Sequence, residues 1–319
     1  MKILVLGAGG IGGYFGGRLA QAGVDTTFLV RPRRREQIAR NGLVIESPLG
    51  DARVAAKTVV AEELKPGYDL VLFTCKAYDL DSAIEAIAPA MGGREGQPGK
   101  EASGCAVLPL LNGLAHFERL DERFGAGRVI GGTCQINVGL SPDGTVRHME
   151  PLNRILFGER DRSKSARAQA FADALAKSTI DWTLSEDILQ DLWEKIAFLA
   201  ALAATTCLFR GNVGEIMATP EGRAIATRCF EANVAIARAE GHAPRDPMLK
   251  WGLERLTTPG PQSASMLRDL EAGKAVEADH IVGHMLSLAR KHGIDDEVLA
   301  MALTHLKTYE ARRAAKRLS

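Results

Sequence analysis

The sequence is poor in cysteine, with five cysteines in 319 residues, and none of them forms a CxxC or a Cys/His ligand spacing. An odd number of widely spaced cysteines predicts neither a disulfide framework nor a structural zinc site. This pattern is typical of reduced thiols, so we expect a cytoplasmic protein. The first ten residues contain no small-residue cleavage site, and we interpret them as a strand rather than a signal peptide.

An excess of charge of one sign is also absent. The 40 basic and 39 acidic residues leave a formal net charge of +1, which gives no general attraction to nucleic acid or to an anionic membrane. The long runs without a charged residue, such as the apolar 196–209, are all shorter than the ~20 residues that cross a bilayer. We therefore expect neither nucleic acid nor a membrane as a partner.

The length of the chain predicts two domains, because one domain typically has ~100–200 residues. In the first half, short apolar runs alternate with helical patterns, which is typical of a parallel sheet covered on both faces. These runs are residues 2–7, 26–30, 70–76, 106–112 and 128–134. Further strands are expected within 135–183, with turns at SPDG (141–144) and EPLN (150–153).

The second half is predicted to be helical, because long alanine-rich amphipathic patterns run from residue 184 to the end. Thr183 and Glu186 stand at the spacing of a capping box, which predicts the start of the first long helix. We place the domain boundary near residue 182. The sequence thus predicts an α/β sheet domain over 1–182 and an all-helical C-terminal domain over 183–319.

A glycine-rich turn follows the first predicted strand, where Gly7, Gly9 and Gly12 form GxGxxG. The first glycine permits a tight turn, the second lets a pyrophosphate approach the backbone, and the third lets helix and strand pack closely. The motif alone is weak, but the strand, turn, helix and second strand all have the expected spacing. We predict that 1–182 is a Rossmann-type, dinucleotide-binding domain.

The end of the second strand lacks the acidic residue that binds the ribose 2′-hydroxyl in NAD sites. Arg31 stands there instead, followed by Arg33, Arg34 and Arg35. A guanidinium binds a 2′-phosphate through charge-assisted hydrogen bonds, so we interpret Arg31 as a phosphate ligand and predict NADPH as the cofactor. Some of the three later arginines are interpreted as a solvated helix start.

One lysine lies on the apolar face of a predicted core helix. In WEKIAFLAALAATT (193–206), Lys195 shares a helical face with Ile188, Leu192, Leu199 and Leu202. The spacing fits a lysine whose head group reaches solvent past the helix edge. It fits equally a proton donor whose pKa desolvation lowers from a reference of ~10.4.

In their order and spacing, the motifs resemble those of the ketopantoate reductases (2-dehydropantoate 2-reductases) over nearly the whole chain. The matching stretches are KILVLGAGGIGGYFGGRLA, VLFTCKAYD, LLNGL, LWEKI, GNVGEI, SASMLRDLEAG and VEADHIVG. The resemblance implies NADPH-dependent reduction of a 2-oxo acid to a 2-hydroxy acid. The most specific expectation is reduction of 2-dehydropantoate to pantoate, a step of pantothenate biosynthesis.

The resemblance also implies roles for individual residues. Lys195 corresponds to the general acid, Glu277 to a substrate contact and Ser265 to a residue of the substrate pocket. Asn112 and Lys76 correspond to residues beside the nicotinamide and its ribose, and Asn112 is also expected near the substrate. The chemistry agrees, because a carbonyl oxygen that gains charge needs a nearby proton donor. We therefore interpret Lys195 as catalytic.

Two positions depart from the family's pattern. Asparagines usually follow the catalytic lysine one and two helical turns later, where this sequence has Leu199 and Ala203. A site with fewer hydrogen-bonding groups makes a weaker demand for a substrate hydroxyl. A less polar 2-oxo acid or ketone therefore stays open as the substrate, as does a non-catalytic NADP-binding regulator.

His280 and His284 stand at the i, i+4 spacing of some metal ligands, but no third ligand is evident in the sequence. We expect no metal and interpret both as surface or inter-domain histidines. A small-molecule substrate is thus the expected partner, and the helical pattern at 224–241 leaves a homodimer possible.

Overall fold

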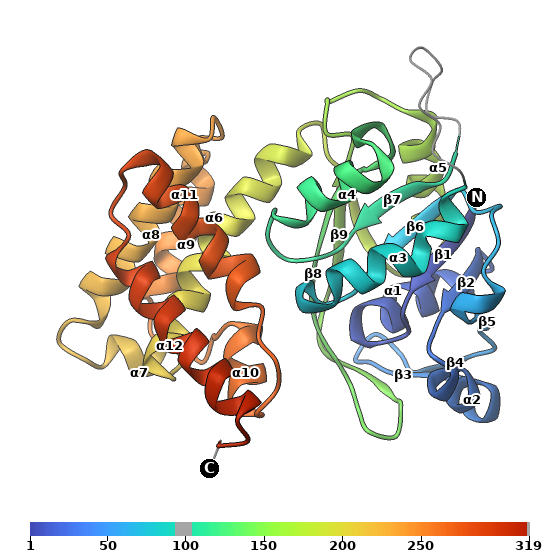
Figure 1. The fold of residues 1–319 in the computed structure, drawn as a ribbon, viewed down its shortest axis with the longest axis horizontal. Coiled ribbons are helices and arrows are strands. Elements are labelled where there is room, and N and C mark those ends of the chain that lie inside the picture. The colour runs from blue at the N-terminus through green and yellow to red at the C-terminus, as the bar shows by residue number, and fades with distance from the viewer. Residues whose placement is uncertain (93–103, 318–319) are drawn as a thin grey trace. The chain divides into compact units, whose positions relative to one another are not determined.

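The computed structural model describes residues 1–92 and 104–317, and their contacts divide the chain into two units (Figure 1). Unit 1 comprises Met1–Leu111 and His116–Ile188. Unit 2 comprises Leu189–Ser319 together with the short segment Asn112–Ala115, which lies between two elements of unit 1 in the sequence. A contribution of four residues from the first half to the helical unit is not apparent from the sequence.

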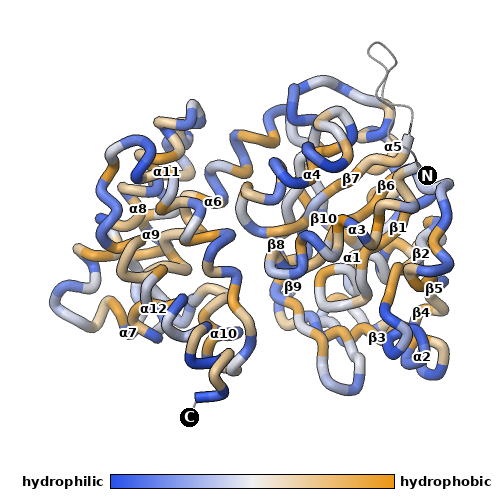
Figure 2. The backbone as a smooth tube through the Cα atoms, viewed as in Figure 1, coloured by the Kyte–Doolittle hydropathy of each residue, from blue (hydrophilic) through white to orange (hydrophobic). Residues whose placement is uncertain are grey.

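Unit 1 is built on a parallel sheet with the strand order β5-β2-β1-β6-β7 in the described part of the chain. Its strands are β1 (Lys2–Leu6), β2 (Asp25–Leu29), β5 (Lys57–Val59), β6 (Leu70–Phe73) and β7 (Ala106–Pro109). Every residue of β6 and β7 is buried, which explains why these strands read as continuous hydrophobic runs (Figure 2). The predicted Rossmann-type sheet is confirmed.

A second sheet has the order β10-β9-β3-β4, with β8 paired to β9. Its strands are β3 (Leu43–Glu46), β4 (Ala52–Val54), β8 (Gly131–Leu140), β9 (Val146–Gly158) and β10 (Asp181–Leu184). The predicted strand 128–134 joins this sheet antiparallel to β9, and only Val129 forms a bridge to Val107 of the parallel sheet.

The predicted turn at SPDG joins β8 to β9, where the Gly144 amide donates to the Ser141 carbonyl. The predicted turn at EPLN does not reverse the chain, but β9 is irregular there: Asn153 pairs with Ile136 and His148 with Val138, so residues 149–152 bulge out of the pairing with β8. Asn153 is buried there, and its side-chain amide donates to the Tyr14 hydroxyl at 3.0 Å and to the Thr179 carbonyl at 3.1 Å. Tertiary hydrogen bonds thus satisfy a residue that would otherwise favour a turn.

Helix α1 (Gly10–Gln21) contacts strands of both sheets, and glycines on two of its faces permit this. A Cβ atom at Gly16 would lie 2.6 Å from the Phe28 ring of β2. One at Gly17 would lie 2.7 Å from the Ile45 side chain of β3. The glycines beyond the GxGxxG motif therefore serve close packing. The other helices of unit 1 are α2 (Pro32–Asn41), α3 (Leu80–Met91), α4 (His116–Phe124) and α5 (Ala166–Leu175).

Unit 2 contains helices and no strand in the described residues from 189 to 317, as predicted. The helices are α6 (Ile188–Phe209), α7 (Val213–Met217), α8 (Gly222–Ala239), α9 (Asp246–Thr257), α10 (Ser265–Glu271), α11 (His284–His292) and α12 (Glu297–Ala314), and a π-helical turn, Asp279–Gly283, precedes α11. Helix α6 is long and apolar enough to cross a membrane, but it is mostly buried. It is the core helix of unit 2.

The predicted capping box at Thr183 and Glu186 is wrong. Thr183 belongs to β10, where it pairs with Leu156 of β9. The Ser185 amide extends this pairing by donating to the Phe157 carbonyl at 2.7 Å, and α6 begins only at Ile188. Pairing with β9 therefore prevails over the local helix signal.

Candidate functional site

The glycine-rich turn joins β1 to α1 at the carboxyl edge of the parallel sheet. Gly7 has φ +88°, a backbone conformation that L-residues rarely adopt, and its amide donates to the Leu29 carbonyl at 2.8 Å. Gly9 is the N-cap of α1 and offers no side chain to the first amides of the helix. The first turn of α1 contains no acidic residue. The amides and the helix dipole can therefore receive an anion.

Gly9 and Gly12 differ in the space available for a side chain. A Cβ atom at Gly12 would collide with the Gly7 carbonyl oxygen and lie 2.5 Å from the Thr74 hydroxyl, so glycine is required for α1 to pack here. A Cβ atom at Gly9 would meet no described atom within 4 Å. Space thus exists in front of the turn where the backbone amides can be approached. The residues fit the pyrophosphate of a dinucleotide.

The arginines after β2 have different environments. Arg31 is the exposed N-cap of α2, next to the carboxyl end of β2. Arg34 is half-buried: its Nε donates to the Ala8 carbonyl at 3.1 Å and its Nη1 to the Gly144 carbonyl at 2.9 Å. Arg34 therefore ties the glycine-rich turn to the β8–β9 turn. Within the sequence it was indistinguishable from its neighbours, because Gly144 is 110 residues away.

Lys76 follows β6, the strand that pairs with β1 on the side opposite β2. It is the half-buried N-cap of a short 3₁₀ turn, Ala77–Asp79. Thr74, two residues earlier, donates its hydroxyl to the Leu6 carbonyl at 2.7 Å and so holds the end of β6 to the end of β1. The structure therefore places Lys76 and the glycine-rich turn at the ends of neighbouring strands.

Asn112 follows β7, yet its contacts lie with unit 2. The next residue, Gly113, has φ +85°, and a Cβ atom there would lie 3.0 Å from the His280 ring and 3.1 Å from the His280 carbonyl. His280 also forms a hydrogen bond with the Asn112 backbone. The structure thus brings Asn112 beside the π-helical turn.

Glu277 lies just before this π-helical turn, and only 7% of its surface is exposed. It is close enough to His280 for its charge to affect the histidine. Burial lowers the pKa of His280 and His284 lowers it further, whereas Glu277 and the hydrogen bond with Asn112 act in the opposite direction; the net pKa is below the ordinary value. His280 is therefore neutral at neutral pH.

His280 is half-buried, and its ring packs against Gly113 of the segment that follows β7. In the residues that the structure describes, no three His, Cys, Asp or Glu side chains form a group that could hold a metal ion. Asp279, exposed on the same turn, instead pairs with Lys307 of α12 at 2.6 Å. Asp279 thus contacts α12, whereas His280 contacts the segment that contains Asn112 and Gly113.

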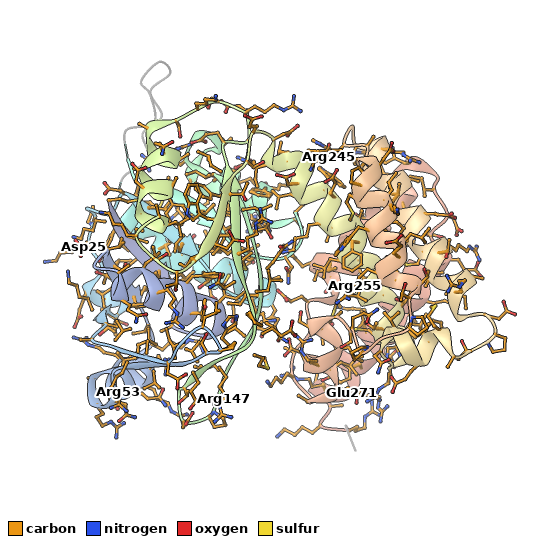
Figure 3. All side chains as sticks on the ribbon, turned by 180° about the vertical axis from the view of Figure 1, so that it is seen from behind. Asp25, Arg53, Arg147, Arg245, Arg255 and Glu271 are labelled. Atoms are coloured by element: carbon orange, nitrogen blue, oxygen red, sulfur yellow. The ribbon has the colours of Figure 1, made fainter. Side chains whose placement is uncertain are left out.

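Lys195 is half-buried on α6, next to a carboxylate that orients this helix. Glu194 accepts hydrogen bonds from the Arg245 amide at 2.8 Å, from its Nε at 2.7 Å and from its Nη2 at 2.6 Å. Arg245 is the N-cap of α9 (Figure 3). Burial alone would raise the pKa of Glu194, but the hydrogen bonds from Arg245 hold it below the ordinary value.

The other positions named from the sequence lie further along α6 and on α10. Leu199 is half-buried and Ala203 is buried, so the side of α6 that carries Lys195 is apolar beyond the lysine. Ser265 is the first, half-buried residue of α10. The amide of Ala264, just before it, is 3.5 Å from the hydroxyl of Thr206 on α6. This contact joins the start of α10 to the last turns of α6.

Comparison with known proteins gives matches that cover most of this chain. Two family models match: "Ketopantoate reductase PanE/ApbA" over residues 3–162 and "Ketopantoate reductase PanE/ApbA C terminal" over 187–310. The uncharacterized oxidoreductase YkpB of Bacillus subtilis is 35% identical over 98% of this chain and 100% of its own length.

Two solved structures extend the similarity to the fold. A PanE/ApbA family ketopantoate reductase from Ralstonia eutropha has a TM-score of 0.86 and 25% identity, covering 98% of this chain and 100% of its own. A 2-dehydropantoate 2-reductase from Geobacter metallireducens has a TM-score of 0.83 and 29% identity, covering 97% of this chain and 99% of its own. The family resemblance and the fold class are confirmed.

The surroundings of Gly9 and Gly12 predict that two alanine substitutions differ in their effect on Tm. Gly12→Ala should lower Tm and weaken dinucleotide binding, because α1 must move away from β1. Gly9→Ala should leave Tm nearly unchanged but weaken binding by about 10-fold or more, because its methyl group occupies space needed by the pyrophosphate. Thermal unfolding and fluorescence titration with NADPH measure the two effects.

Gly127→Ala is the matched control, because a Cβ atom there also meets no described atom within 4 Å and the position is exposed. It should change neither Tm nor binding. Full NADPH affinity in Gly9→Ala would contradict the placement of the pyrophosphate at this turn.

Glu194→Gln should lower the free energy of unfolding at pH 7 by about 1–2 kcal/mol, the lower part of the range for hydrogen bonds to charged groups, since the Arg245 side chain is more than half exposed. Because the folded pKa of Glu194 is depressed, this contribution is complete above the unfolded pKa of ~4.3. It is lost as the pH falls through the folded pKa. Urea unfolding at several pH values measures the difference.

Glu271→Gln serves as the control, because Glu271 and Arg210 form an exposed pair in the same unit. Its effect should be close to zero at every pH. An equal loss of stability in both variants would show that the Glu194–Arg245 contact stabilises the protein no more than an exposed ion pair does.

Proposed function

We propose a function from one established premise: the chain belongs to the ketopantoate reductase PanE/ApbA family. It is accordingly an oxidoreductase acting on CH–OH groups. The proposal is that it uses NADPH to reduce a 2-oxo acid to a 2-hydroxy acid in the cytoplasm. 2-Dehydropantoate is the first candidate substrate, because a 2-dehydropantoate 2-reductase is 29% identical over almost the whole chain.

The nucleotide-binding part of the proposal is supported by unit 1. Gly7, Gly9 and Gly12 would hold the pyrophosphate against the first turn of α1, where the backbone can be approached. The exposed Arg31 would bind the 2′-phosphate. Lys76 and Asn112 would lie beside the nicotinamide and its ribose. The nicotinamide, when bound, supplies the hydride.

The single observation that supports chemistry, beyond nucleotide binding, is Lys195. It is half-buried on the apolar side of the core helix of unit 2, and its neighbour, the buried Glu194, is held by hydrogen bonds from the exposed Arg245. In the proposed mechanism Lys195 Nζ donates a proton to the carbonyl oxygen of the substrate as negative charge develops there. Glu277 and Ser265 would bind the substrate and hold it in place.

A second candidate substrate is favoured by Leu199 and Ala203. Both are apolar, and they lie one and two helical turns after Lys195. Neither can donate or accept a hydrogen bond with a polar substrate group. A 2-oxo acid or ketone without the hydroxyl of ketopantoate would lose nothing at these positions, so a less polar substrate is the alternative within the same reaction class.

NADPH oxidation followed at 340 nm with a panel of 2-oxo acids tests the proposal. The wild type should oxidise NADPH with at least one of ketopantoate, 2-oxoisovalerate and phenylglyoxylate. Lys195→Ala should lower kcat by about 10²–10⁴-fold, the usual contribution of a general acid, with NADPH affinity unchanged. A variant that keeps most of its turnover would remove Lys195 from the mechanism.

The panel also separates the candidates. A higher kcat/KM for ketopantoate than for the hydroxyl-free acids supports the first substrate, and the reverse order supports the second. Leu199→Asn should then shift the ratio towards ketopantoate by up to about 10-fold, the value of one added hydrogen bond. NADPH binding without oxidation by any 2-oxo acid would favour a non-catalytic regulator.

Cofactor preference follows from Arg31. Arg31→Ala should raise the Kd for NADPH by about 10-fold or more and leave the Kd for NADH nearly unchanged, because only NADPH carries the 2′-phosphate. Fluorescence titration with each nucleotide measures this. Arg33→Ala, which changes another exposed arginine of the same helix start, is the control. Equal weakening of both nucleotides by Arg31→Ala would exclude a phosphate-specific role.

A further inference from the structure

Asn112–Ala115 is an unusual segment, because it follows a strand of unit 1 but its contacts lie with unit 2. Leu114 packs against the hydrophobic core of unit 2. The Leu114 contact holds the segment against the core of unit 2 but does not fix its backbone dihedral angles. Gly113 has a wider range of these angles than other residue types. A directional contact is needed to hold the backbone of Asn112 in one orientation.

His280 supplies a contact of this kind. It forms a hydrogen bond with the Asn112 backbone, and its ring approaches Gly113 closely enough that a Cβ atom would lie 3.0 Å from Cδ2. The His280 carbonyl is equally close, at 3.1 Å from the same position. The positive φ of Gly113 and this double approach explain why no other residue type suits the position.

The π-helical turn gives His280 a second neighbour. The buried Glu277 lies two residues before this turn, and its charge acts on the histidine. π-Helical turns are rare and frequently occur at functional sites. His280 therefore interacts both with the buried carboxylate of Glu277, through its charge, and with the Asn112 backbone, through a hydrogen bond.

We propose that His280 is a positioning residue, which anchors Asn112 and Gly113 to the π-helical turn and thereby sets the position of Asn112 relative to Glu277. Its neutral ring provides one N–H donor for the hydrogen bond without adding a charge to the site. The anchoring rests on the contacts alone. Its consequence for catalysis rests on the proposed function, in which Asn112 and Glu277 both bind ligands.

Hydrogen exchange in the full-length protein tests the anchoring without any assay of activity. His280→Ala should speed amide exchange in residues 112–115 by about 10-fold or more, while exchange in the core of α6 is unchanged. His292→Gln, which changes a histidine of α11 that pairs with Glu240, is the control and should leave 112–115 at the wild-type rate. Wild-type exchange in His280→Ala would overturn the proposal.

A double-mutant cycle tests the ring contact separately. Gly113→Ala should lower Tm through its positive φ and its collision with His280. In the His280→Ala background the ring is absent, so the same substitution should cost clearly less. Additive losses of Tm would show that the ring does not contact this segment and would overturn the proposal.

Kinetics tests the consequence. His280→Gln keeps one side-chain N–H donor, whereas His280→Ala keeps none. His280→Ala should raise KM for the 2-oxo acid by about 3–10-fold, the value of one hydrogen bond, and His280→Gln should restore much of this loss. Equal KM values in all three proteins would overturn the positioning role. Failure of the wild type to reduce any 2-oxo acid would instead refute the proposed function, and the exchange and Tm results would still decide the anchoring.

Discussion

The contact between Glu194 and Arg245 determines how the core helix of unit 2 is oriented. A helix rich in alanine and leucine offers few directional contacts, so hydrogen bonds to a buried carboxylate such as Glu194 help to specify its orientation. Three donors of Arg245 hold the Glu194 carboxylate. Because successive helical residues are about 100° apart, this contact also determines where Lys195 points. The proposed proton donor therefore depends on a neighbour that takes no part in the reaction.

Short-range patterns predicted much of the fold. The runs at 2–7, 26–30, 70–76 and 106–112 correspond to strands of the parallel sheet, and the change to helices near residue 184 is observed. These predictions succeed because burial on both faces of a strand, or on one face of a helix, leaves a periodic record in the sequence. The glycine-rich turn was also predicted, since its spacing reflects steric requirements of the backbone itself.

The errors occur where a distant segment decides the local structure. Thr183 is in a strand because β9 pairs with it, and Asn153 pairs with Ile136 of β8 while its side chain donates to Tyr14 and Thr179. Nothing near either residue in the sequence records these partners. The contact of His280 with Asn112 and Gly113 was likewise not predicted, because these residues lie more than 160 residues earlier. Patterns within one helix cannot reveal such a contact.

Two glycine turns, one in each unit, are held in the same way. A glycine turn loses more conformational entropy on folding than any other, and it has no side chain with which to hold itself in place. In both cases a side chain from another element contacts the backbone at a glycine with positive φ: Arg34 at Gly144, and His280 at Gly113. Arg34 also donates to Ala8 inside the GxGxxG motif. In each case a side chain distant in the sequence holds a glycine turn in one conformation.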